Sequence, residues 1–355
     1  MKLFNYKSIT FLLFLLVISA ENFGQSFLSD SVAAKEHHHT PWDILSGSGN
    51  DSIVCYKQAH RNMYFVVTGL IILIALIAIK LLRTNRKNNK ILKAQNEIIE
   101  EKNKNITDSI NYAKRLQAVI LPPKDLINNI LSEHFIIYQP KDIVSGDFYW
   151  VSHHDNKIMV AAVDCTGHGV PGALLSIVGH NAINQTVNEL GIIQPAKVLE
   201  SMNTIIKKIL HQDKGSDIRD GMDMALCTFD KTTNILEYAG ANNPVFIVSS
   251  EGQLNVIKGS KLTVGSMEDG KVEPPVNHTI QLKKGDCFYI FSDGYVDQFG
   301  GMNNKKFKTN RFQELLISIN NQTMPEQEKI IFQAFINWKG ENEQVDDVLI
   351  IGIRV

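Results

Sequence analysis

The feature that most limits how this chain can fold is an apolar run from Tyr64 to Leu82, which reads YFVVTGLIILIALIAIKLL. Its one charge, Lys80, lies near its end, and apolar residues would surround a helix here on every face. A buried helix of a water-soluble protein normally keeps a polar face, whereas a membrane-spanning helix needs about 20 apolar residues. The run therefore predicts one transmembrane helix over residues 64–82.

Basic residues without any acidic residue follow this run, from Lys80 to Lys93. Basic flanks of membrane helices remain on the cytoplasmic side. We therefore expect a single-pass protein of the inner (cytoplasmic) membrane. Residues 21–63 would lie outside, and the large C-terminal part would lie in the cytoplasm.

A shorter apolar run, from Ile9 to Ala20, follows two lysines at the N-terminus. It is too short to span a bilayer, and its layout is typical of a signal peptide over residues 1–20. An uncleaved short anchor is the alternative. Residues 21–63 are too few for an ordinary core. There we favour a solvated loop for His37–His39 over a metal site, and Cys55 could pair with another chain.

Composition excludes several classes of protein. The chain has 355 residues, with 36 basic and 37 acidic side chains, and a general nucleic-acid binder needs a strong basic excess. Its four cysteines form no CxxC pair, which argues against a zinc finger and a disulfide scaffold. A hydrophobic content of 44% is sufficient for a folded core.

The linker over residues 83–121 is predicted to be one long helix, because it lacks Pro and Gly from Thr84 to Leu121 and Pro122–Pro123 follows. Apolar residues recur every seven positions, which is the spacing of coiled-coil d positions. These positions are Leu92, Ile99, Ile106, Ala113 and Ile120, and the matching a positions are Asn89, Asn96, Asn103, Ile110 and Gln117. A polar seam of this kind favours a parallel homodimer; a solvated single helix is the alternative.

Beyond the linker, short strand-like runs and longer helical stretches are grouped rather than strictly alternating, which predicts an α+β domain. The expected strands are 135–138, 148–152, 158–164, 224–230, 235–240, 245–249, 287–292 and 348–354. The expected helices are 171–189, 195–210 and 327–338, with a fourth near 311–319.

Aspartates stand at strand ends or in tight turns in four separate segments of this domain. They are Asp147, Asp164, Asp293 and the pair Asp346–Asp347. Carboxylates gathered at one place repel each other and are costly to bury. Hard divalent cations would remove that cost, and an oxygen-only ligand set selects Mg²⁺ or Mn²⁺ over Zn²⁺. Two such ions can activate a shared water for attack on phosphorus.

The segment after Asp164, CTGHGVPG, adds detail to this prediction. Gly167 and Gly169 allow a tight backbone, and Pro171 suits the first turn of a helix. A helix N-terminus beside the metals would favour an anionic group. His168 could be a ligand or an acid, and we favour a supporting role beside the ligands.

Four sequence blocks, GDFYW, DCTGHG, SDGYVDQFGG and QVDDVLIIGIRV, resemble the signature blocks of SpoIIE-type serine phosphatases. These belong to the metal-dependent protein phosphatase superfamily typified by protein phosphatase 2C. The resemblance covers roughly residues 108–355. It implies a phosphatase domain over residues 125–355, built as a four-layer α-β-β-α sandwich of two antiparallel sheets flanked by helices. It also implies two Mn²⁺ or Mg²⁺ in a cleft at one end.

Carried over by motif, the resemblance implies a role for each aspartate. Asp164 would bridge both ions and hold the attacking water, helped by the carbonyl of Cys165, and Asp147 would bind one ion. Asp293 and Asp346 would bind the other, with Asp347 as the alternative to Asp346.

Other positions match the family less closely. Asp297 would be a weaker third site. Lys141 is a weak substitute for the arginine that clamps phosphate in many relatives. Ser145 and Asn242 stand where the family often has Gly and His, but neither is an expected ligand.

The implied activity is hydrolysis of phosphoserine or phosphothreonine on a protein. By resemblance, the substrate is a STAS-type anti-sigma-factor antagonist of a partner-switching pathway, and the membrane helix and coiled coil regulate the enzyme. A catalytically silent, membrane-tethered binding module is the alternative. A sensor histidine kinase would share the membrane layout, but the sequence lacks a Gly-rich ATP lid.

Overall fold

The computed structural model describes residues 48–211, 220–266 and 273–355. The expected signal peptide, His37–His39 and most of the segment 21–63 lie outside these residues. The chain divides into two units, residues 1–98 and residues 99–355, and each is described by itself.

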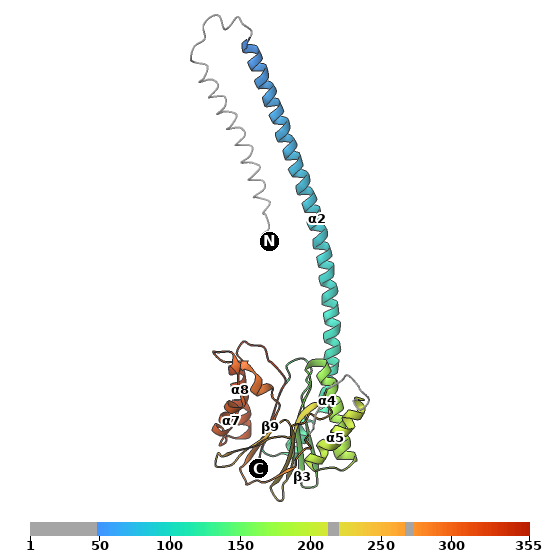
Figure 1. Ribbon diagram of the computed structural model, residues 1–355, viewed down its shortest axis with the longest axis vertical. Helices are drawn as coiled ribbons and strands as arrows, with labels where there is room; N and C mark the ends of the chain where they lie inside the picture. The colour runs from blue at the N-terminus through green and yellow to red at the C-terminus, as the bar shows by residue number, and fades with distance from the viewer. Residues whose placement is uncertain (1–47, 212–219, 267–272) are drawn as a thin grey trace. The chain divides into compact units, whose positions relative to one another are not determined.

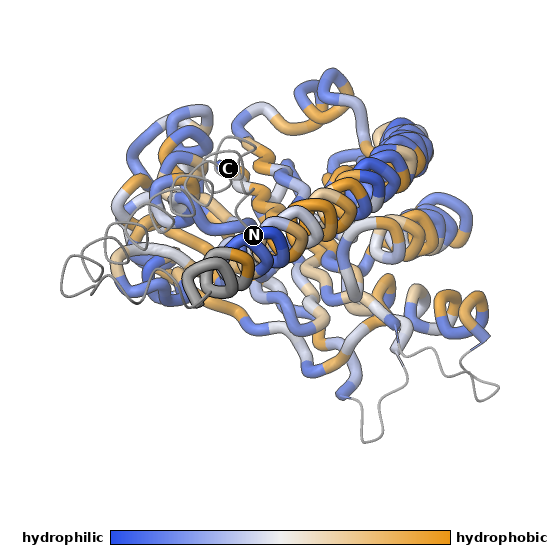
Figure 2. Tube along the Cα trace, turned by 90° about the horizontal axis from the view of Figure 1, so that it is seen from above, coloured by the Kyte–Doolittle hydropathy of each residue, from blue (hydrophilic) through white to orange (hydrophobic). Residues whose placement is uncertain are grey.

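The first unit contains most of helix α2, which runs without interruption over Ser48–Ile120. It is the one described helix that is long and apolar enough to cross a membrane, by length and composition, and its most apolar window has a mean hydropathy of 2.8. None of that window is buried. Figure 2 shows this stretch in orange, giving way to more hydrophilic turns. The helix ends just before Pro122–Pro123, as expected from the inability of proline to continue a helix.

The second unit is built on two five-stranded sheets in which all strand pairs are antiparallel. One sheet has the order β2-β3-β4-β5-β8 and the other β1-β12-β9-β6-β7. The strands of the first are β2 (Phe148–His154), β3 (Lys157–Cys165), β4 (Met222–Asp230), β5 (Ile235–Ala241) and β8 (His278–Gln281). Those of the second are β1 (His134–Gln139), β12 (Val348–Arg354), β9 (Cys287–Phe291), β6 (Val245–Val248) and β7 (Leu254–Ile257).

Helices cover the outer face of each sheet (Figure 1). Helices α4 (Gly169–Asn184) and α5 (Pro195–Ile209) pack on the first sheet, and a π-helical turn, η1 (Gln185–Glu189), continues α4. Helices α7 (Thr309–Ser318) and α8 (Met324–Lys339) cover the second. The other elements among the described residues of this unit are α3 (Lys124–Ile130), α6 (Gly294–Asp297) and a small hairpin, β10 (Phe299–Gly300) with β11 (Lys305–Lys306). The four-layer α-β-β-α sandwich predicted from the sequence is confirmed.

Three apolar clusters hold these layers together. The central cluster lies between the sheets and contains Val160, Ile290 and Ile351, all at most 1% exposed. A second lies under α4 and α5, and a third lies under α7 and α8. Strands β3, β9 and β12 are buried along nearly their whole length. The segments that adjoin the ends of these strands are therefore fixed in position.

The sequence patterns missed strands β7 and β8 and the short elements α3, α6 and β10–β11. Both missed strands lie at sheet edges, are four residues long and contain exposed positions. Edge strands bury only part of their side chains, so their composition resembles that of loops.

Candidate metal centre

The predicted aspartates come from strand ends that the two sheets bring to the same end of the sandwich. Asp147 precedes β2 and Asp164 lies near the end of β3, and the pairing of Phe148 with Val163 places these two side by side. In the other sheet Asp293 follows β9 and Asp346–Asp347 precede β12, which are neighbouring antiparallel strands. The charges of both groups act on one another. The structure therefore brings aspartates of both sheets close enough for their charges to act on one another.

Asp147 is the most deeply buried of these carboxylates, with 2% of its surface exposed. Its Oδ2 atom has no hydrogen-bond partner, although the Ser292 side chain interacts with its carboxylate. Burial raises its pKa well above the ordinary value, and the charge of Asp164 raises it further. A buried carboxylate oxygen without a donor is costly unless a cation is bound to it.

Asp164 and Asp293 show the same effect more moderately. Burial raises the pKa of Asp164 to about 8, and the charges of Asp293, Asp346 and Asp223 add to the rise. Desolvation raises the pKa of Asp293 to about 6, with a further contribution from Asp297. Carboxyl groups are thus crowded at this end of the sandwich, and their charged forms are disfavoured unless positive charge is supplied, as is typical of a site that receives a cation.

The two members of the pair Asp346–Asp347 have different environments. Asp347 is buried, and its two carboxylate oxygens accept hydrogen bonds from the backbone N–H groups of Lys141 and Gly146, each at 2.7 Å. Asp346 is partly exposed and accepts one bond, from the Asp347 N–H. Asp347 therefore organises the loop before Asp147, and this difference supports Asp346 as the ligand.

Glycines allow the backbone to approach the carboxylates closely. A Cβ atom on Gly146 would collide with the Gly167 carbonyl oxygen and would lie 3.2 Å from that of Cys165. A Cβ on Gly172, at the start of α4, would meet the same Gly167 carbonyl. Gly167 itself has φ +82°, a conformation that glycine adopts without strain. The Cys165 carbonyl thus lies against the Asp147 loop, where the resemblance places a metal ligand.

A basic cluster lies on the rim of the site, at the N-terminus of α4. His168 Nδ1 lies 2.7 Å from a carboxylate oxygen of Asp142, and His168 Nε2 lies 2.9 Å from Lys141 Nζ. His168 and Asp142 are each nearly half exposed. Gly169, with φ +65°, leads the chain from His168 into the helix. The cluster presents one lysine ammonium group beside the loop that carries Asp147.

Asp297, expected as a weak third metal site, forms an ion pair with Lys306 of β11 at 2.7 Å. Its carboxylate therefore already has a cationic partner. Lys306 also lowers the pKa of Asp293 slightly against the other effects.

Sequence reasoning missed Asp223 as a member of the acidic cluster. Asp223 lies in β4 directly opposite Asp164, and Asn242 and Thr263 both donate to its Oδ1 at 2.9 Å. The available signal was an acidic residue within an otherwise apolar strand, MDMALCTF. Asn242, which stands where the family often has His, therefore provides one of the donors to Asp223.

The donor chemistry of these residues suits hard divalent cations. The candidate donors are all carboxylate or carbonyl oxygens, which suit Mg²⁺ and Mn²⁺, and one buried oxygen, Oδ2 of Asp147, lacks a donor. Within the part of the chain that the structure describes, however, no three His, Cys, Asp or Glu side chains form a complete ligand set around one point. The carboxylates are close enough for their charges to interact.

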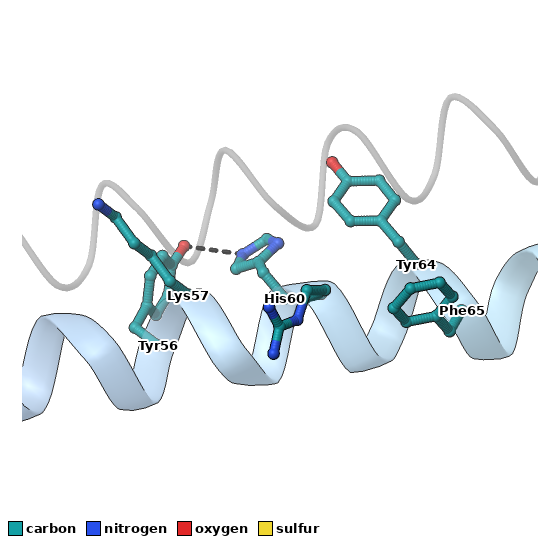
Figure 3. Close-up of a pocket in the computed structure, with 6 residues that line it drawn as sticks. Tyr56, Lys57, His60, Tyr64 and Phe65 are labelled. Carbon is teal, nitrogen blue, oxygen red and sulfur yellow. Dashed lines mark hydrogen bonds between the residues drawn. The ribbon is translucent and has the colours of Figure 1, made fainter.

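A hollow on α2 is separate from this chemistry. It is lined by Tyr56, Lys57, His60, Arg61, Tyr64 and Phe65. Figure 3 shows aromatic rings at successive turns of one helix, with His60 Nε2 2.9 Å from the Tyr56 hydroxyl. The lining contains no carboxylate, so it does not provide hard cation ligands.

Comparison with known proteins identifies the family of this domain. Residues 154–355 match the family described as Stage II sporulation protein E (SpoIIE). Phosphoserine phosphatase RsbU of Bacillus subtilis (strain 168) is 25% identical over 194 residues, which are 54% of this chain and 54% of RsbU. The chain thus spans about half the length of this curated relative.

Two solved structures resemble the sandwich. The SiaA-PP2C domain of Pseudomonas aeruginosa is 32% identical, with a TM-score of 0.65, and the match covers 71% of this chain and 98% of that domain. The PP2C phosphatase domain of SpoIIE from Bacillus subtilis, solved with a fragment of its regulatory domain, is 21% identical with a TM-score of 0.50. That match covers 63% of each chain and indicates a shared fold.

Proposed function

We propose, from the premise that this chain belongs to the SpoIIE family of PP2C-type serine/threonine phosphatases, that it dephosphorylates a regulatory protein at the cytoplasmic face of a membrane. The single observation that carries the proposal is the cluster of aspartates from both sheets, in which the pKa of Asp164 is raised to about 8. Such a cluster is suited to cations rather than to stability, since unpaired buried carboxylates are costly.

In the proposed site, aspartates from both sheets together hold a pair of Mg²⁺ or Mn²⁺ ions. Asp147 and Asp164, with the Cys165 carbonyl, would hold them from the first sheet, and Asp293 and Asp346 from the second. When bound, the ions would lower the pKa of a water and neutralise phosphate oxygens. Asp347 does not need to bind an ion in this scheme, because it fixes the backbone of the Asp147 loop.

The chain's own residues would orient the phosphate. Lys141 provides a positive charge at the rim, held by His168, which is in turn held by Asp142. The N-terminus of α4 begins in the same loop and favours an anionic group. An in-line attack on phosphorus then needs no covalent phosphoenzyme, and the leaving serine oxygen takes its proton from water.

The substrate and the regulation follow from the resemblance. The relative RsbU is named a phosphoserine phosphatase, and we propose a phosphorylated STAS-type anti-sigma-factor antagonist as the substrate. Residues 64–82 would anchor the chain in the inner membrane, and residues 83–106 of α2 would pair as a parallel coiled coil in a homodimer.

The test is phosphate release from a phosphoserine peptide by the purified full-length chain in detergent micelles with Mn²⁺. We expect Asp164→Asn to lower kcat by at least about 100-fold, because it weakens both the charge and the geometry of the site. Asp155→Asn is the matched control: Asp155 is exposed in the β2–β3 turn with φ +52°, which asparagine tolerates. Equal activity of Asp164→Asn and wild type, or no hydrolysis by wild type, would reject the proposal; the second result would favour a silent binding module.

A further inference from the structure

The last turns of α2 lie against the phosphatase domain, although the sequence predicts them as part of a coiled-coil seam. The seam residues Leu92, Ile99 and Ile106 are 55–57% exposed. The next seam residues, Ile110, Ala113 and Ile120, are partly buried, and Gln117 is only 5% exposed. One face of the helix therefore changes its surroundings after Ile106, from solvent to the phosphatase domain.

Gln117 makes unusually specific contacts for a seam residue. Its Nε2 donates to the Ser145 carbonyl at 2.6 Å, and its Oε1 accepts from the Ser145 N–H at 3.1 Å. The same Nε2 donates to Ser176 Oγ of α4 at 3.0 Å. Ser145 and Ser176 are completely buried. The carboxamide thus satisfies both backbone groups of Ser145 where water has no access.

Ser145 connects Gln117 to Asp147. The Asp147 N–H donates to Ser145 Oγ at 3.0 Å, and the intervening Gly146 N–H donates to Asp347. The segment 145–147 is therefore fixed by α2 on one side and by the start of β12 on the other. Loss of the Gln117 contacts would leave the Ser145 backbone unpaired and free to shift, and Asp147 would shift with it.

We propose that Gln117 is a positioning residue for Asp147, through which the end of α2 sets the cation affinity of the site. The inference rests on the proposed function and deepens it. It has a direct structural consequence: a coiled coil that continued to Ile120 would need Gln117 in its seam, so the same side chain could not hold Ser145. Pairing of the helices beyond Ile106 and correct placement of Asp147 therefore exclude each other.

The test measures Mn²⁺ binding directly, by the electron paramagnetic resonance signal of free Mn²⁺, for the full-length chain in detergent micelles. Gln117→Met keeps the length of the side chain and removes its hydrogen bonds. We expect the Kd for Mn²⁺ to rise about tenfold. Asn103→Met is the matched control, because Asn103 is also a predicted a position of α2 but is exposed.

Gln117→Glu is the second variant, since it keeps the shape of the side chain and decides the question if Gln117→Met does not fold. Weaker Mn²⁺ binding by each Gln117 variant that folds, with Asn103→Met unchanged, supports the proposal. Unchanged Mn²⁺ affinity in a folded variant overturns it, even if its melting temperature falls, because a purely structural role predicts that result. If wild type itself fails to bind Mn²⁺, the proposed function fails instead.

Discussion

The phosphatase domain and helix α2 differ in what surrounds their side chains. In the phosphatase domain, Asp147 is 2% exposed and is surrounded by backbone and side chains from both sheets. Along α2, apolar side chains such as Ile72 and Ile106 are more than half exposed. Positions that carry chemistry are thus fixed by contacts that are distant in sequence, whereas the apolar run of α2 is specified by its local sequence and is exposed in the structure.

The largest difference between the two regions is expected for glycine-to-alanine substitutions, at Gly146 in the phosphatase domain and at Gly69 in α2. Gly146→Ala would push a Cβ into the carbonyl oxygens of Gly167 and Cys165, at a cost of about 1–3 kcal/mol of unfolding free energy. Displacement of Asp147 by about 1 Å is expected to reduce kcat/KM by about 100-fold.

Gly69→Ala in α2 is the control for Gly146→Ala, because nothing lies within 4 Å of its Cβ. Alanine also favours helix over glycine. The measurements are initial rates with a phosphoserine peptide and thermal melting of both variants. A Gly146→Ala enzyme with wild-type activity would show that the loop is less tightly fixed than the structure indicates.

A second, intermediate effect concerns pH. The folded-state pKa values of Asp164, about 8, and Asp293, about 6, lie above the ordinary value for aspartate. The folded state therefore binds more protons than the unfolded state, so the stability of the metal-free protein is greatest below about pH 4 for these groups and falls as pH rises towards 8.

Chemical denaturation in EDTA at several pH values measures this slope. We expect Asp164→Asn to flatten it, and Mn²⁺ to raise stability at pH 8 by binding only the folded state. Metal-free stability that rose between pH 5 and pH 8, equally in wild type and Asp164→Asn, would contradict the assignment of a repulsive acidic cluster.

The smallest effect on catalysis is expected in α2. Ile106→Asn removes an apolar seam residue and should weaken dimerisation roughly tenfold, with activity at saturating Mn²⁺ changed less than about twofold. Ile98→Asn is the matched control, because Ile98 is also 57% exposed but lies outside the seam. Sedimentation equilibrium in detergent measures both variants. Equal weakening by the two substitutions would remove the support for a heptad seam.

How far the sequence could go depends on the range of the contacts involved. It predicted the long helix, since its apolar run, lack of Pro and Gly, and terminal Pro122–Pro123 are local signals. It also predicted the buried strands and, through the family blocks, the sandwich. Edge strands β7 and β8 were missed because their short, half-exposed patterns differ little from loops.

Only the tertiary structure decided which side chains share the site and what each one touches. Asp346 and Asp347 are adjacent in sequence, yet Asp347 is engaged by two backbone N–H groups roughly two hundred positions away. Asp223 joins the cluster through strand pairing. Gln117 fits the heptad pattern, but its side chain forms a hydrogen bond with Ser145 instead. Periodicity along a chain records local conformation and burial, whereas these partners are chosen by the packing of two sheets and a helix that the periodicity does not encode.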